Sequence, residues 1–246
     1  MDLRAILFDV NGTLLDIETD EGQDHIYRVI SRLLAYQGLQ LAPQVIRDRY
    51  FAIMEQQRKS SLERFPEFDA VAIWQTMLQP QPAAAEGLPA DSLSRLPLFL
   101  AGLHRTLAHK RLEPYPDVPR VLEELGKQYK LGIVTDAQSV YALPELRLTG
   151  LSDLFACVIV SGDYGYRKPD PRLFSLGLKA LGVQPNQAIY LGNDMYHDVF
   201  GAQQVGLRAV FWPTQWGKKE HPGVSPDYII YHFAQLRDAV AFLAAR

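Results

Sequence analysis

Polar clusters stand where several apolar segments of the sequence end, and their residue types suit phosphate chemistry. Asp9 directly follows the first apolar segment, Leu3–Phe8. The later clusters are Thr135-Asp136, Ser161-Gly162-Asp163 and Gly192-Asn193-Asp194. A threonine hydroxyl can donate to a phosphoryl oxygen, carboxylates can hold a hard divalent cation, and one carboxylate can attack phosphorus.

A lysine completes this set of side chains. Lys168 lies in Tyr166-Arg167-Lys168-Pro169-Asp170-Pro171, just before a predicted helix. From a helix start the side chain can point back towards the edge of a neighbouring sheet. Its ammonium group can donate to phosphoryl oxygens.

A parallel sheet is needed to bring these residues together. From Tyr115 onwards, short apolar segments alternate with helical patterns of roughly 10–15 residues, which is typical of βαβ units. The expected strands after the first are 130–135, 156–160, 188–191, 208–211 and 228–230, and the expected helices are 116–129, 171–181, 198–205 and 233–243. The carboxyl ends of parallel strands share one edge, so we expect the polar clusters to meet there in a Rossmann-like α/β core.

Residues 16–113 differ from the rest of the chain. Apolar residues recur at helical spacing over 26–34, 45–54 and 93–107, residues 65–78 are rich in aromatic side chains, and the Pro- and Gly-containing stretch 79–89 is expected to be a loop. No strand is predicted here. We therefore expect an α-helical domain, 16–113, inserted into a core formed by 1–15 and 114–246.

Composition excludes several classes of protein. The 246 residues are 48% hydrophobic and 22% charged, as in an ordinary globular protein, and the net charge of -3 argues against a nucleic-acid-binding face. No apolar run approaches the roughly 18 residues of a membrane span. The N-terminus carries Asp2 and Arg4 before Asp9, unlike a signal peptide, and the single cysteine, Cys157, lies in a core-strand pattern. We expect a cytoplasmic protein that binds neither membrane nor nucleic acid.

Four motifs in order resemble those of the haloacid dehalogenase superfamily of aspartate-nucleophile hydrolases. Phe8–Leu14 is similar to the family's D-x-D-G-T, and Gly132–Thr135 to its strand that ends in a phosphate-binding hydroxyl. Arg167–Asp170 contains the motif lysine, and Leu191–Ala202 is similar to the acidic metal motif. The insert between the first two motifs matches the family's subfamily I, whose members carry a helical cap.

The resemblance implies a role for each matched residue in catalysis. Asp9 would attack phosphorus and form an aspartyl-phosphate, which water would then hydrolyse. Thr135, Asp136 and Lys168 would bind the phosphorylated substrate, with Lys168 holding the nucleophile and the phosphoryl oxygens together.

The resemblance also implies a Mg²⁺ site. The ligands would be Asp9, the backbone carbonyl of Asn11 and the carboxylate of Asp194. Asn193 and Asp198 would support this site, and Asp198 would orient either the ligands of the metal or Lys168.

Asn11 departs from the family pattern, because the family's phosphatases carry an acid–base Asp at this position. An amide cannot supply the proton transfer that is worth about 10²–10⁴-fold in rate. The leaving group could need no proton, as in an acyl phosphate, an aryl phosphate or a halide. An acid from the insert could act instead, with Glu21, Asp24 and His25 as candidates. The protein could also be a weakened relative, or Asn11 could be an engineered substitution.

These observations predict a Mg²⁺-dependent phosphatase acting on a small phosphorylated metabolite, as a monomer or homodimer. One alternative is a 2-haloacid dehalogenase-like hydrolase, although the acidic fourth motif favours phosphoryl chemistry. Another is a catalytically weakened member that binds a ligand. The sequence leaves open the substrate and the role of the loop 212–220.

Overall fold

The computed structural model describes residues 2–79 and 90–245, which form two compact units. One is Met1–Ile17 with Leu112–Arg246, called the core unit below, and the other is Glu18–Arg111, called the helical insert. We expected these junctions after residues 15 and 113. Most of the loop expected at 79–89 lies outside the described residues. No described helix is long and apolar enough to cross a membrane.

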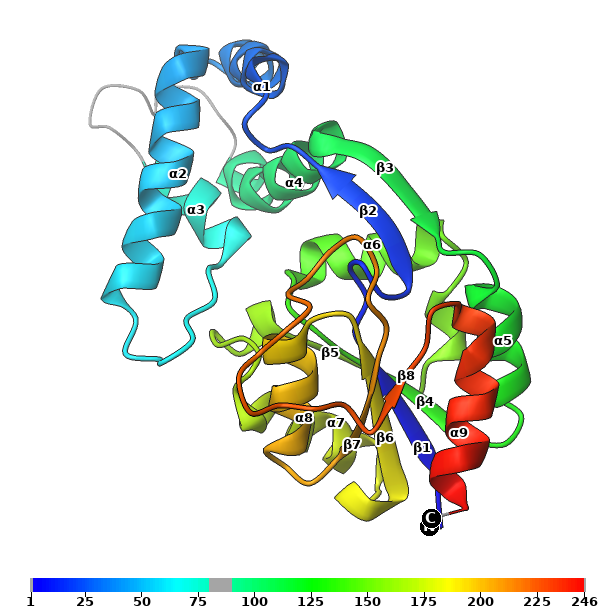
Figure 1. The fold of residues 1–246 in the computed structure, drawn as a ribbon. Helices are drawn as coiled ribbons and strands as arrows, with labels where there is room; N and C mark the ends of the chain where they lie inside the picture. The colour runs from blue at the N-terminus through cyan, green and yellow to red at the C-terminus, as the bar shows by residue number, and fades with distance from the viewer. Residues whose placement is uncertain (1, 80–89, 246) are drawn as a thin grey trace. The chain divides into compact units, whose positions relative to one another are not determined.

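The described part of the core unit contains a six-stranded parallel sheet (Figure 1). Its strands are β1 (Ala5–Phe8), β4 (Lys130–Thr135), β5 (Cys157–Val160), β6 (Ala188–Gly192), β7 (Arg208–Phe211) and β8 (Tyr228–Ile229), in the order β5-β4-β1-β6-β7-β8. The chain runs outwards from β1 in both directions, so β1 lies between β4 and β6. At such a reversal of strand order, a crevice opens at the carboxyl ends of the strands. The predicted α/β core is confirmed.

Helices cover both faces of this sheet, because successive strand residues point to opposite sides. Ile6 and Phe8 of β1 belong to one hydrophobic cluster, and Ala5 and Leu7 belong to the other. The first cluster includes residues of α5 (Val118–Leu125), α6 (Ser139–Leu148) and α9 (Leu236–Ala244), and the second includes residues of α7 (Pro171–Leu181), the π-helical turn Met195–Phe200 and α8 (Gly201–Gln203). Burial on both faces explains why these strands read as continuous apolar runs.

The inserted segment contains four helices among its described residues: α1 (Asp24–Tyr36), α2 (Pro43–Ser60), α3 (Ala70–Met77) and α4 (Ala90–Ala108). The prediction that 16–113 lacks strands is wrong. β2 (Leu15–Thr19) and β3 (His109–Pro114) pair with each other where the chain leaves and re-enters the core unit. Both strands are only partly buried and carry charged residues, including the ion pair Arg111–Glu18 at 3.7 Å, so they lack the apolar run by which a strand is recognised.

Two further local differences concern helices. α6 was not predicted, and Pro144 inside it interrupts the sequence pattern of a helix. The helix expected at 198–205 begins earlier, as a π-helical turn over Met195–Phe200. Asp194 caps that turn by accepting hydrogen bonds from its first backbone N–H groups.

Candidate active site

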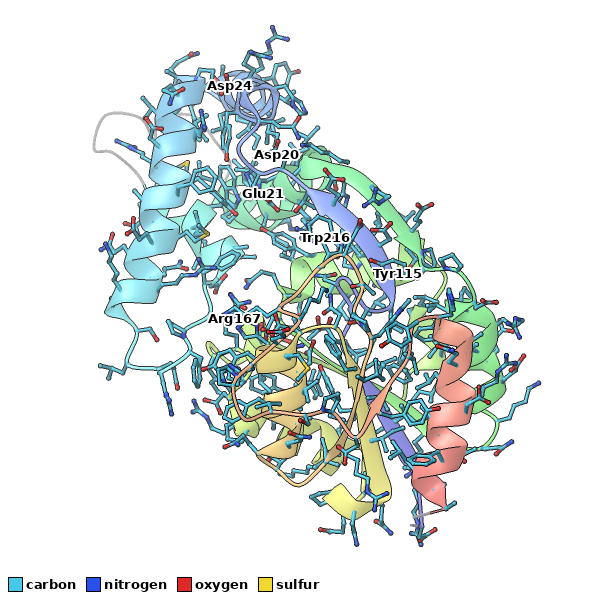
Figure 2. All side chains as sticks on the ribbon, in the orientation of Figure 1. Asp20, Glu21, Asp24, Tyr115, Arg167 and Trp216 are labelled. Atoms are coloured by element: carbon cyan, nitrogen blue, oxygen red, sulfur yellow. The ribbon has the colours of Figure 1, made fainter. Side chains whose placement is uncertain are left out.

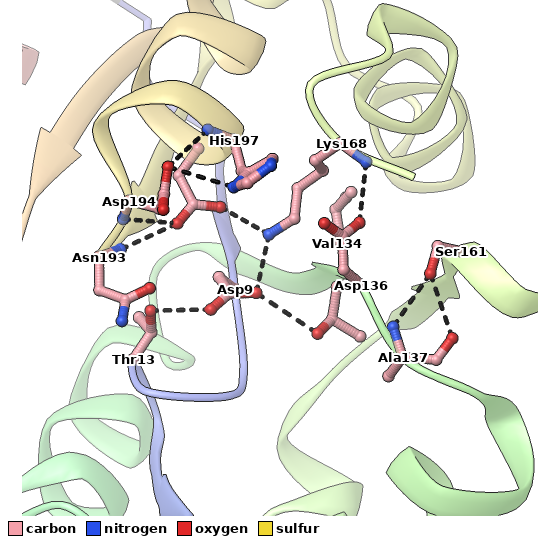
Figure 3. A network of polar contacts seen from close by, with 12 residues as sticks. Asp9, Thr13, Val134, Asp136, Ala137, Ser161, Lys168, Asn193, Asp194 and His197 are labelled. Carbon is pink, nitrogen blue, oxygen red and sulfur yellow. Dashed lines mark hydrogen bonds and ion pairs between the residues drawn. The ribbon is translucent and has the colours of Figure 1, made fainter. Parts of the chain in front are cut away.

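Asp9 lies at the carboxyl end of β1 and is the centre of a buried polar network (Figure 3). Its side chain accepts three hydrogen bonds. Oδ1 accepts from Lys168 Nζ at 2.8 Å and from Thr135 Oγ1 at 3.4 Å, and Oδ2 accepts from Thr13 Oγ1 at 3.0 Å. Strands β1 and β4 and the loop before α7 thus bring together three residues that are far apart in sequence.

Lys168 is the cation of this network and is only 2% exposed. Nζ also donates to Asp198 Oδ1 at 2.5 Å and to the hydroxyl of Tyr190 at 3.1 Å. Burial by itself would lower the pKa of Lys168, but the negative charges of Asp198 and Asp9 outweigh it and hold that pKa well above the ordinary lysine value. Lys168 is therefore a fixed positive charge beside Asp9.

Asp198 is held in place by the fourth motif itself. Its Oδ2 accepts from the backbone N–H groups of Asn193 at 3.0 Å and Asp194 at 2.9 Å. Gly192 makes this approach possible, because a Cβ there would lie 2.3 Å from Cγ of Asp198. Asp198 thereby contacts Lys168. That it orients this lysine, or the ligands of a metal, in catalysis stays a prediction.

Asp136 positions the loop that carries the lysine. Its Oδ1 accepts from the backbone N–H of Lys168 at 2.8 Å, and its Oδ2 lies 3.3 Å from Nε of Arg167. These contacts direct the carboxylate to the loop backbone. A direct contact of Asp136 with substrate stays a prediction.

The described hydrogen bonds of the cluster Ser161-Gly162-Asp163 connect it to the segment after β4. The Ser161 hydroxyl accepts from the backbone N–H of Ala137 and donates to its carbonyl (Figure 3), and Asp163 accepts from the Ser139 hydroxyl at 2.7 Å. This cluster fastens the end of β5 to the segment that follows β4. It has a structural role at the edge of the sheet.

Asp194 acts as a helix cap. Oδ1 accepts from the backbone N–H groups of Tyr196 and His197, both at 2.8 Å, and Oδ2 accepts from that of Lys218 at 2.8 Å. Burial by itself would raise the pKa of Asp194, but the hydrogen bonds from His197 and Lys218 hold it below its usual range. Asp194 is therefore ionised, and both of its oxygens already have donors. Its role as a metal ligand stays a prediction.

Asn11 and Asn193 are amides at two positions of the matched motifs. Oδ1 of Asn11 is buried and has no hydrogen-bond partner among the residues that the structure describes. Nδ2 of Asn193 donates to Oγ1 of Thr214 at 3.2 Å, and Thr214 donates to the carbonyl of Gly12 at 2.7 Å.

Three residues of this site were not predicted from the sequence: Thr13, Tyr190 and Thr214. Thr13 lies inside the first motif, and Tyr190 is the one residue with a side-chain hydroxyl in the apolar strand β6, so both left a signal. Thr214 left none, because its partner Gly12 is distant in sequence.

The loop 212–220 also belongs to the site. Met195 N–H donates to the carbonyl of Lys218 at 2.9 Å, and a Cβ at Gly12 would lie 3.0 Å from Cβ of Trp216 (labelled in Figure 2).

Asp9 and Asn11 offer carboxylate and amide oxygens at this site, which are ligands that a hard cation such as Mg²⁺ accepts, although Lys168 Nζ already lies 2.8 Å from Asp9 Oδ1. The buried side-chain oxygen of Asn11 has no hydrogen-bond partner among the described residues, so it also can accept a cation or a hydrogen-bond donor. Among the described residues, however, no group of three or more His, Cys, Asp or Glu side chains is placed to hold a metal. A metal at Asp9 would therefore depend on amide and backbone oxygens as well as on carboxylate.

The chain is similar to known hydrolases in sequence and in fold. It is 31% identical over 134 residues to the glyceraldehyde 3-phosphate phosphatase of Pyrococcus furiosus, covering 52% of this chain and 55% of that protein. The chain spans about half the length of the curated relatives it matches. In fold it is similar to a 2-haloacid dehalogenase from Pseudomonas syringae pv. tomato (TM-score 0.68, 23% identity, covering 98% of this chain and 99% of that one). It is also similar to a HAD phosphatase from Thermococcus onnurineus (TM-score 0.60, 27% identity, covering 97% and 98%).

The sequence pattern of one family covers all four motifs. The haloacid dehalogenase-like hydrolase pattern matches residues 6–212, which include most of the core unit and the whole helical insert. The resemblance inferred from the motifs is thus confirmed. This chain belongs to the haloacid dehalogenase-like hydrolase family.

Proposed function

We propose that this protein is a Mg²⁺-dependent phosphatase that acts on a small phosphorylated metabolite, with Asp9 as the nucleophile. The supporting observation is the buried contact of Asp9 with Lys168 and Thr135 at the switch point of the sheet. A carboxylate beside a fixed cation and a hydroxyl donor can receive the negative charge of a phosphoryl group. The likeness to phosphatases in sequence favours phosphate esters as substrates.

In the first step, an oxygen of Asp9 attacks phosphorus while the bond from phosphorus to the leaving oxygen breaks. The product is an aspartyl-phosphate on Asp9. Lys168 and Thr135 donate to phosphoryl oxygens and offset the charge that develops on them. In the second step, water attacks phosphorus, the bond to Asp9 breaks, and inorganic phosphate leaves.

Asp9, the backbone carbonyl of Asn11 and an oxygen from the fourth motif would hold the Mg²⁺. When bound, it supplies positive charge to the phosphoryl oxygens and lowers the repulsion between the carboxylate and the substrate. Lys168 and Asp198 keep Asp9 in place whether or not the cation is present, because their contacts are made by protein atoms alone.

The leaving group must depart without a proton from Asn11. Acyl and aryl phosphates meet this condition, since their leaving groups are stable as anions. Alternatively, an acid from the helical insert could supply the proton to the leaving group. There, Glu21 pairs with Arg105 at 3.0 Å and Asp24 with Arg47 at 3.2 Å (both acids are labelled in Figure 2), so either would have to give up an ion pair.

The test is hydrolysis of p-nitrophenyl phosphate by the full chain, with Mg²⁺ and with excess EDTA. We expect turnover that depends on Mg²⁺ and that Asp9→Asn abolishes. Asp163→Asn is the matched control, because Asp163 follows β5 at the same edge of the sheet and hydrogen-bonds to Ser139 instead of the Asp9 network. Absence of turnover on any aryl or acyl phosphate would overturn the proposal.

Asn11 also favours a second candidate, hydrolysis of a carbon–halogen bond. Departure of a halide needs no proton, so an amide at position 11 is no handicap there. This candidate predicts release of chloride from 2-chloropropionate without any metal. Chloride release that Asp9→Asn abolishes, together with inactivity on aryl phosphates, would establish it over the phosphatase.

A further inference from the structure

The loop 212–220 of the core unit presents a partly exposed aromatic side chain, Trp216, whose residue is 39% exposed. Single exposed aromatic side chains are common on proteins, so exposure by itself indicates no function. Trp216 differs from that general case in two respects. The loop is fastened on both sides of it, and its side chain lies against the first motif.

Before Trp216, the loop is fastened to the first motif and to the strand that follows it. The hydroxyl of Thr214 donates to the carbonyl of Gly12 at 2.7 Å. Nε2 of Gln215 donates to Oδ1 of Asp16 at 3.1 Å. These two contacts hold the residues that directly precede Trp216.

After Trp216, the loop is fastened to the fourth motif. The backbone N–H of Lys218 donates to Oδ2 of Asp194 at 2.8 Å. The two sides of the loop are also joined to each other, because Nζ of Lys219 donates to the backbone carbonyls of Thr214 and Trp216. The backbone that carries the indole is therefore held by protein contacts alone, without substrate.

The indole of Trp216 lies directly against Gly12. A Cβ at Gly12 would lie 3.0 Å from Cβ and 3.3 Å from Cδ1 of Trp216, and glycine places no side chain between them. Gly12 directly follows Asn11 and precedes Thr13, whose hydroxyl donates to Oδ2 of Asp9 at 3.0 Å. Trp216 thus packs on the residue next to Asn11, the position that bears on departure of the leaving group.

We propose that Trp216 is a specificity-determining residue that stacks on the aromatic leaving group of an aryl phosphate. This inference rests on the proposed function and narrows its substrate class. Because Asn11 supplies no proton, the leaving group must be stable as an anion, and a phenolate meets this condition. Its planar ring also suits the indole, since aromatic rings attract each other in offset-stacked and edge-to-face arrangements. Acetyl phosphate meets the first condition and lacks the ring.

The test compares p-nitrophenyl phosphate with acetyl phosphate, each hydrolysed by the full chain with Mg²⁺. Trp216→Leu should raise KM for the aryl ester about three- to tenfold, because the contact between the rings is lost, and should leave KM for acetyl phosphate unchanged. Trp216→Phe should retain most of the affinity for the aryl ester, because a ring remains. Phe242→Leu is the matched control: Phe242 is 40% exposed and packs on Tyr228 with ring centroids 5.4 Å apart, so both KM values should stay the same.

Lys219→Met serves if Trp216→Leu fails to fold, which thermal unfolding would reveal. It keeps the indole and removes the donor that joins the two sides of the loop, so KM should again rise for the aryl ester alone. An unchanged KM for the aryl ester in Trp216→Leu, or an equal rise for both substrates, would overturn the inference. Hydrolysis of acetyl phosphate alone would do the same and, if it requires Asp9, would keep the proposed function. If neither substrate is hydrolysed, both fail.

Discussion

At the scale of single residues, Asn11 bears most directly on the proposed mechanism, because it stands where an acid would assist the leaving group. The network around Asp9 places a nucleophile, a cation and a hydroxyl donor together. Neither Lys168 nor Asp198 is available to give a proton to the leaving group. The two neighbouring carboxylates raise the pKa of Lys168 and keep it protonated, and Asp198 accepts hydrogen bonds at both oxygens. In the proposed mechanism, none of these described side chains is therefore placed to protonate a poor leaving group.

Asn11→Asp should therefore raise the rate of hydrolysis of alkyl phosphates. The added carboxyl group can protonate a departing alkoxide and then deprotonate the attacking water, a contribution of about 10²–10⁴-fold. Phosphate release from an alkyl and an aryl ester, measured side by side, should show a much larger gain for the alkyl ester. An unchanged alkyl rate, with Asp9 still essential, would mean that another group supplies the proton.

At the scale of elements, the end of β6 is a closely packed junction of the core unit. Gly192 ends this strand, and the carboxylate of Asp198 lies directly over it. The sequence predicted β4, α7 and β7 with their observed bounds, because apolar runs and helix-stop signals mark them. It missed β2 and β3, whose stability comes from pairing with each other, a contact that local patterning does not encode.

Gly192→Ala should destabilise the fold and displace Asp198 from Lys168. The new Cβ would lie 2.3 Å from Cγ of Asp198, and overpacking of this kind costs about 1–3 kcal/mol. Gly102→Ala, inside α4, is the control, because its Cβ would meet nothing within 4 Å and alanine favours a helix by about 1 kcal/mol over glycine. Urea unfolding should move in opposite directions for the two variants. Wild-type stability of Gly192→Ala would contradict the junction described here.

At the scale of the whole molecule, the two compact units differ in what holds their interiors together. The core unit buries aliphatic side chains on both faces of a sheet. The helical insert buries a histidine among aromatic rings: His104 is stacked on Tyr50 with centroids 4.3 Å apart, and its Nε2 lies 3.1 Å from the hydroxyl of Tyr27. Tyr27 donates to the carbonyl of Glu21, so Nε2 carries the proton and donates to Tyr27.

His104 should make the stability of the helical insert depend on pH. Burial lowers the pKa of His104 from 6.5 to about 4 in the folded state, so between these values the unfolded chain binds the proton and the folded chain does not. Stability is therefore complete above pH 6.5 and falls as the pH drops, by about 2 kcal/mol at pH 5. Hydrogen exchange at pH 7.5 and 5 should show faster opening of α4 at pH 5.

His104→Phe is the variant that isolates this effect, since it keeps an aromatic ring and removes the titrating group. We expect the loss of protection in α4 at the lower pH to become smaller in the variant, while α7 of the core unit changes equally in both proteins. An identical pH response of α4 in the two proteins would show that His104 does not control it.

The sequence by itself determined the family, the parallel sheet and the edge at which Asp9, Thr135 and Lys168 meet. These follow from local patterns: apolar strands, helix signals and the polar residue that ends each strand. Only the tertiary structure decided what each polar side chain faces. Asp194 looks like a metal ligand in sequence, yet its oxygens accept from the backbone of its own turn and from Lys218, while the amide of Asn193 is oriented by Thr214. Hydrogen-bond direction depends on which groups pack against a side chain, and Thr214 reaches Gly12 only after the chain has folded, across 202 positions of sequence.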